Sequence, residues 1–152
     1  MAITIVRGIL VNIGMAMHFA GSLQGNFQIQ PVIYPLTIFI SAFSLAIAWY
    51  KDLPDRAGDA HFGYRTFPIL YSPKTALYVG AAFVMAAYGC CIYWSYQQAE
   101  PLLMYSLIVL SALFLLHLRT VRLDEQKSIR KFYQLFWVFF FATYLSFLWV
   151  LN

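Results

Sequence analysis

The chain has 152 residues, of which 62% are hydrophobic and only 11% are charged, and its formal net charge is +4. A soluble domain carries about 25% charged and about 45–50% apolar residues, and a soluble chain of this length has too little core to bury so much apolar surface. The composition therefore excludes an ordinary soluble domain and favours a protein embedded in the lipid bilayer. The basic residues lie in short segments between apolar runs, so membrane topology explains them better than nucleic-acid binding does.

Five apolar runs are long enough for helices that cross a bilayer, each of which needs about 20 mostly apolar residues. In chain order they are residues 3–22, 32–50, 75–96, 102–118 and 132–151. The runs are continuous rather than alternating, which indicates helices and not a barrel. We therefore predict an all-α fold, a polytopic transmembrane helical bundle with about five spans.

Basic residues alternate between the connecting loops, as five spans require. The loops after the first and third runs contain no basic residue. The loop 51–74 contains Lys51, Arg56, Arg65 and Lys74, and the loop 119–131 contains Arg119, Arg122, Lys127, Arg130 and Lys131. Because basic loops remain in the cytoplasm, we expect residues 51–74 and 119–131 to be cytoplasmic.

Aromatic residues are dense in the last run, where we expect lipid contact and anchoring at the membrane surface. They are Phe132, Tyr133, Phe136, Trp137, Phe139, Phe140, Phe141, Tyr144, Phe147 and Trp149.

Three carboxylates follow the second run at spacings of three and four residues, at Asp52, Asp55 and Asp59. If the helix continues past the membrane face, they fall within a sector of about 60°. Pro54 and Gly58 interrupt the helical pattern, but a bent turn would still bring the three side chains together. Carboxylates crowded in this way repel one another and favour a bound cation.

Oxygen ligands suit Mg²⁺, which proteins usually hold through a few carboxylates, waters and substrate phosphates. Lys51 and Arg65 lie nearby in sequence and are suited to contact phosphate oxygens that the metal does not neutralise. The competing interpretation of the same residues is an ordinary solvated loop of mixed charge, and spacing alone names no reaction.

Polar residues within the first run form a second candidate group. Arg7 and His18 are eleven positions apart, which places them about 20° from alignment and about 16 Å apart along a helix. Ionisable residues inside a span tend to face the bundle interior or a cavity, and Asn12 lies on another face. The alternatives are that Arg7 extends to the lipid headgroups and that His18 and Asn12 form hydrogen bonds between helices.

The segment 51–59 (Lys-Asp-Leu-Pro-Asp-Arg-Ala-Gly-Asp), followed by residues 62–67 (Phe-Gly-Tyr-Arg-Thr-Phe), resembles the second Asp-rich motif of the UbiA superfamily of intramembrane prenyltransferases. The resemblance is closest to the branch that contains homogentisate phytyl- and solanesyltransferases. Residues 6–8 (Val-Arg-Gly), with Asn12, Gly14 and His18, resemble the helix that precedes this motif in that branch.

The resemblance implies a helical bundle around a central cavity, in which Mg²⁺ and two Asp-rich motifs hold a prenyl diphosphate. Loss of diphosphate gives an allylic cation that alkylates an electron-rich aromatic acceptor. By position, Asp55 and Asp59 correspond to the metal-binding pair of the second motif, and Asp52 is an adjacent carboxylate. The implied substrate-binding residues are basic or polar: Lys51, Arg65, Arg7, Asn12 and His18.

The first Asp-rich motif of that superfamily has no counterpart in this sequence, and five spans correspond to the last five of the family's nine. We therefore expect residues 1–152 to be the C-terminal portion of such an enzyme, with little activity on their own. The alternative is a non-enzymatic membrane subunit that retains the fold. A transporter or channel is disfavoured, because the charges cluster at one face rather than along a pathway.

Overall fold

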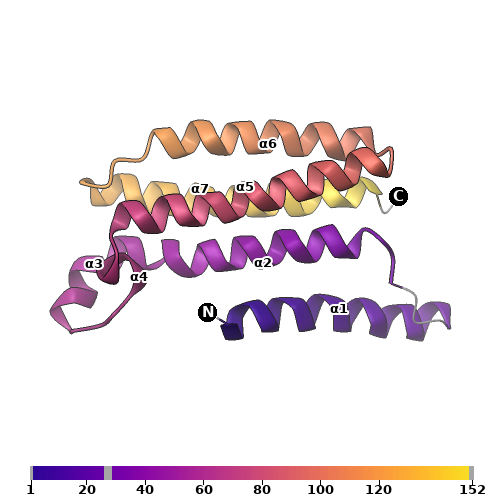
Figure 1. Cartoon of the computed structure of the whole chain (residues 1–152), viewed down its shortest axis with the longest axis horizontal. Helices are drawn as coiled ribbons and strands as arrows, with labels where there is room; N and C mark the ends of the chain where they lie inside the picture. Colours follow the sequence, from indigo (N-terminus) through magenta and orange to yellow (C-terminus); the bar gives the residue numbers. More distant parts are fainter. Residues whose placement is uncertain (1, 26–28, 151–152) are drawn as a thin grey trace.

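The structure is a computed structural model that describes residues 2–25 and 29–150, and helices account for nearly all of its regular structure (Figure 1). The five long helices are α1 (Ala2–Gln24), α2 (Ile33–Tyr50), α5 (Pro73–Gln97), α6 (Pro101–Arg119) and α7 (Gln126–Ser146). The first four match the predicted runs to within a few residues. The fifth, α7, begins at Gln126 rather than at residue 132, so the end of the predicted loop 119–131 is helical. The predicted all-α bundle is confirmed. The shorter elements are α3 (Asp52–His61), α4 (Phe67–Leu70) and a final 3₁₀ turn, Phe147–Val150.

Three helical segments within the described ranges are long and apolar enough to cross a membrane: Ile33–His61, Pro73–Gln97 and Pro101–Arg119. The described side chains of α1 form a shorter apolar stretch, Gly8–Ser22. Helix α7 is not among the three, and its first turns carry Lys127, Arg130 and Lys131. Membrane crossing by α1 and α7 therefore stays a prediction.

Helix α2 lies at the centre of the bundle and packs against α1, α5 and α7, while α6 contacts α5 and α7. Its buried Phe43 stacks on Phe136 of α7, with ring centroids 4.9 Å apart and an interplanar angle of 18°. Phe43 also forms a T-shaped contact with Tyr88 of α5, with ring centroids 5.9 Å apart. Aromatic contacts of this kind join the three helices through their buried faces.

The expectation that the aromatic residues of the last run face lipid is wrong for several of them. Phe132, Phe136 and Phe147 are fully buried, whereas Phe141 and Tyr144 are exposed. Phe132 and Phe136 are four positions apart, so they share one face of α7, and this helix packs against α2 and α6. Phe147 lies in the 3₁₀ turn after α7, which contacts α6.

Tyr50, the last residue of α2, fixes the distance between α2 and α5. Its ring is fully buried, and its hydroxyl donates a hydrogen bond to the carbonyl oxygen of Leu77 at 2.9 Å. A Cβ added at Gly80 would lie 2.7 Å from Cε1 of Tyr50, closer than real side chains approach. Glycine at this position therefore lets the two helices pack closely just before the Asp-rich segment begins.

Candidate functional site

The Asp-rich segment forms a helix, α3, that continues directly from α2. Lys51 at the junction has helical backbone angles (φ −61°, ψ −32°), and its N–H donates to the carbonyl oxygen of Ile47 at 3.0 Å. Pro54 is the third residue of α3, where its missing N–H is tolerated, and Gly58 lies within the helix without ending it. The helix therefore does continue past the apolar run, which is the condition under which the three carboxylates share one sector.

The three carboxylates of α3 differ in exposure. Asp55 is exposed, and Asp52 and Asp59 are partly buried. Desolvation by burial raises the pKa of Asp52, the carboxylates of Asp59 and Asp55 raise it further, and the ammonium of Lys51 opposes the shift. The structure thus brings the three charges close enough to repel one another, and a bound cation would relieve that repulsion.

The spacing of these carboxylates limits how they can bind a metal. Asp52 and Asp59 are seven residues apart, which separates them by about 10 Å along the helix. Within residues 2–25 and 29–150, no group of three or more His, Cys, Asp or Glu side chains is placed to hold a metal ion. Mg²⁺ at this helix would therefore need further oxygen ligands, and diphosphate or water oxygens fit that requirement.

The end of α3 is fixed by Gly63, which has a φ of +73°. The N–H of Gly63 donates to the carbonyl oxygen of Ala60 at 3.2 Å, and the N–H of Tyr64 donates to that of Asp59 at 2.9 Å. This pair of hydrogen bonds is the Schellman motif. The motif favours glycine because one of its residues adopts left-handed backbone angles, which are unfavourable for a residue with a Cβ. The motif turns the chain at the end of the Asp-rich helix and leads directly into Arg65.

The two basic residues predicted to contact phosphate, Lys51 and Arg65, are both exposed. They lie at opposite ends of α3, one at its start and one just after its last turn. Neither forms an ion pair with a carboxylate in the part of the chain that the structure describes. Both cations are therefore available to a ligand at α3.

The polar residues of α1 are not joined to this site by any contact that the structure describes. Asn12 donates to the carbonyl oxygen of Gly8 in its own helix at 2.7 Å, and His18 is exposed, edge-on to Phe19 at 5.7 Å. The side chain of Arg7 lies outside the described part. Figure 1 shows α1 displaced along the bundle axis away from α3.

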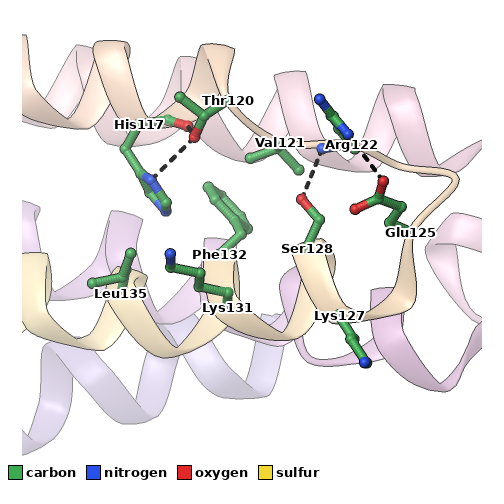
Figure 2. Close-up of a pocket in the computed structure, with 10 residues that line it drawn as sticks. All are labelled: His117, Thr120, Val121, Arg122, Glu125, Lys127, Ser128, Lys131, Phe132 and Leu135. Atoms are coloured by element: carbon green, nitrogen blue, oxygen red, sulfur yellow. Dashed lines mark hydrogen bonds and ion pairs between the residues drawn. The ribbon is translucent and has the colours of Figure 1, made fainter.

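Sequence reasoning missed a pocket of about 500 Å³ between the end of α6 and the start of α7 (Figure 2). Gln126, at the start of α7, donates from Nε2 to the carbonyl oxygen of Pro54 in α3 at 3.1 Å. The two basic connections, 51–74 and 119–131, therefore meet at one end of the bundle (Figure 1). The basic residues of 119–131 were visible in the sequence, but the cavity depends on how α6 and α7 pack.

Comparison with known proteins shows which family the sequence matches. Residues 1–144 match the UbiA prenyltransferase family. The chain is 33% identical to homogentisate phytyltransferase of Synechocystis sp., over 100% of this chain and 52% of that relative. It is 28% identical to homogentisate phytyltransferase 1, chloroplastic, of Arabidopsis thaliana, over 95% of this chain and 38% of the relative.

A third relative is homogentisate solanesyltransferase, chloroplastic, of Arabidopsis thaliana, which is 27% identical over 95% of this chain and 39% of its own length. The chain thus spans about half the length, or less, of the curated relatives it matches. No solved structure matches the chain.

Proposed function

This chain belongs to the UbiA prenyltransferase family, and we propose that it supplies the C-terminal half of a membrane enzyme that transfers a prenyl group to an aromatic acceptor. The relatives are named for transfer of phytyl or solanesyl groups to homogentisate, so the proposed donor is a prenyl diphosphate and the proposed acceptor resembles homogentisate. The observation that carries the proposal is the helix α3, which gathers three carboxylates at one end of an apolar bundle and has a cation at each end, neither of them in an ion pair within the described ranges.

Asp55 and Asp59, with Asp52 beside them, are proposed to hold Mg²⁺ jointly with the diphosphate oxygens. Their oxygen-only donor set suits this ion, and the metal, when bound, would neutralise charge on the leaving diphosphate. Lys51 and Arg65 would contact the remaining diphosphate oxygens, where fixed cations stabilise the negative charge that develops as the group departs.

In the proposed reaction, the bond between the prenyl carbon and the diphosphate oxygen breaks, and its electron pair leaves with the diphosphate. A new carbon–carbon bond forms to the aromatic ring, which then loses a proton. The electron-poor prenyl carbon needs protection from water, and the buried aromatic core of α2, α5 and α7 would provide a dry environment. Arg7, Asn12 and His18 remain proposed cavity residues on α1.

The proposed orientation places residues 51–74 and 119–131 in the cytoplasm, where a soluble prenyl diphosphate or its headgroup would reach α3. The positive-inside rule supports this orientation, and so does the meeting of both basic connections at one end of the bundle.

A chimera tests the proposal. The part of Synechocystis homogentisate phytyltransferase that matches this chain is replaced by residues 1–152, and membranes are assayed for transfer of phytyl from phytyl diphosphate to homogentisate with Mg²⁺. We expect turnover by the chimera and by the intact relative, and little or none by this chain alone. A folded, membrane-inserted chimera without turnover would contradict the proposal. Robust turnover by the isolated chain would contradict the idea that the chain supplies only half of the active site.

A further inference from the structure

The pocket between α6 and α7 is a second candidate site, separate from the carboxylates of α3. Its walls come from the last turn of α6 and the first turns of α7, and Figure 2 shows their side chains converging across the gap between the two helices. Its lining combines polar side chains with three apolar ones, those of Val121, Phe132 and Leu135. A site with this mixed lining suits an amphipathic ligand that has a charged head.

The segment that encloses the pocket is strongly basic. Residues 119–131 contain five Lys or Arg side chains and two acidic ones. Arg122 is paired with Glu125 at 3.0 Å, and Figure 2 shows Lys127 pointing away from the gap. Lys131, by contrast, extends along the gap toward the ring of His117, and no carboxylate in the described ranges forms an ion pair with it. The pocket therefore presents a cation without a counter-ion.

Hydrogen-bond donors and the dipole of α7 add to this cation. The hydroxyl oxygen of Ser128 accepts a hydrogen bond from the N–H of Arg122 at 2.9 Å, which leaves the hydroxyl hydrogen free for a ligand. Ser128 lies in the first turn of α7, and that turn contains no acidic residue. The N-terminus of a long helix favours a bound anion because its dipole is positive there.

The wall of the pocket contains the half-buried ring of His117. Nε2 of His117 is shielded from solvent, and no hydrogen bond of ordinary geometry reaches it from the described residues. The ring stacks on Phe132 with centroids 5.4 Å apart. Buried polar atoms are nearly always hydrogen-bonded in native proteins. This nitrogen lies beside Lys131 in the wall of the pocket, where an oxygen of a bound group could pair with it.

We propose that the α6–α7 pocket binds a phosphate oxyanion, held by Lys131, Ser128 and the N-terminal end of α7. The phosphate can come from a phospholipid headgroup or from a soluble diphosphate. The apolar residues in the lining and the location at the end of α6 favour the lipid, since basic pockets between transmembrane helices recognise anionic headgroups. This site does not depend on prenyl transfer by α3.

The test measures binding to the purified full chain in detergent. Native mass spectrometry with phosphatidylglycerol, and with phosphatidylcholine for comparison, examines the lipid source, and calorimetry with inorganic diphosphate examines the soluble source. The variants are Lys131→Gln, Lys131→Arg and Arg130→Gln, the last being an exposed neighbour outside the pocket. Circular dichroism checks that each variant keeps the helix content of the parent.

We expect Lys131→Gln to weaken binding about fivefold or more, the effect of one cation at a membrane surface, while Lys131→Arg and Arg130→Gln bind like the parent. This pattern with phosphatidylglycerol alone identifies a lipid headgroup, and the same pattern with diphosphate identifies a soluble phosphate. Equal losses in Lys131→Gln and Arg130→Gln, no loss in either, or no binding of any probe by the parent chain would each overturn the proposal.

Discussion

Replacing Gly80 with alanine is expected to disrupt the junction between α2 and α5. The new Cβ would lie 2.7 Å from Cε1 and 2.8 Å from Cζ of Tyr50. The Tyr50 ring cannot move away freely, because it packs edge-on against Phe132 at 5.0 Å and Phe136 at 4.9 Å. Its hydroxyl is also held by the hydrogen bond to Leu77. Either the two helices separate or the ring leaves this position.

The magnitude follows from three opposing contributions to the free energy of unfolding. Overpacking a filled core costs about 1–3 kcal/mol, and losing the buried hydrogen bond of Tyr50 costs about 1 kcal/mol more. Alanine in place of glycine inside a helix returns about 1 kcal/mol. The expected net loss for Gly80→Ala is therefore about 1–3 kcal/mol.

Unfolding in mixed micelles with increasing SDS, followed by circular dichroism, measures this loss. Gly89→Ala is the matched control, because Gly89 lies in the same helix and a Cβ there meets nothing within 4 Å. We expect the control to be neutral or slightly stabilising. A Gly80→Ala variant as stable as Gly89→Ala would refute the close packing of Tyr50 on α5.

Three further predictions concern single positions. Ala99 has a φ of +55° in the turn that ends α5, and this left-handed conformation costs an L-residue about 1–2 kcal/mol. Ala99→Gly should therefore raise the free energy of unfolding by about 0.5–1 kcal/mol, and a lower SDS midpoint for the variant would contradict this. Gly63→Ala should fray the end of α3 and speed hydrogen exchange of the Tyr64 amide about three- to fivefold, whereas unchanged exchange would argue against the Schellman turn. Burial raises the pKa of Asp52 above its ordinary value of 3.8, so the charged carboxylate destabilises the fold at neutral pH. This loss of stability decreases as the carboxylate is protonated and has disappeared once the pH is below 3.8. Asp52→Asn should accordingly be more stable than the parent near neutral pH and equal to it in acid, and a loss of stability at neutral pH would show that the carboxylate is favourably paired.

The helical bundle was predictable because long apolar runs leave few alternatives to a helix in lipid. The continuation of α2 into α3 was also predictable, since Asp52, Asp55 and Asp59 repeat at helical spacing despite Pro54. The burial of Phe136 was not, because a helix rich in aromatics on every side does not reveal which face meets protein and which meets lipid.

The candidate site was predictable only where it is local in sequence. Lys51, the three aspartates and Arg65 lie within one helix and its turn, so spacing alone could group them. The pocket at Lys131 depends on the packing of α6 against α7, and the hydrogen bond from Gln126 to Pro54 joins residues far apart in the chain. No periodic pattern records contacts of that kind.

Turnover of the chimera with altered carboxylates tests the central claim most directly. Asp55→Asn and Asp59→Asn are compared with Asp124→Asn, an exposed carboxylate in the connection between α6 and α7. Because removing one group that stabilises developing charge typically costs about a hundredfold in rate, we expect a loss of that size at Asp55 and at Asp59 and none at Asp124. Equal turnover in all three variants would contradict a diphosphate site on α3 and would favour a membrane subunit that retains the fold without the chemistry.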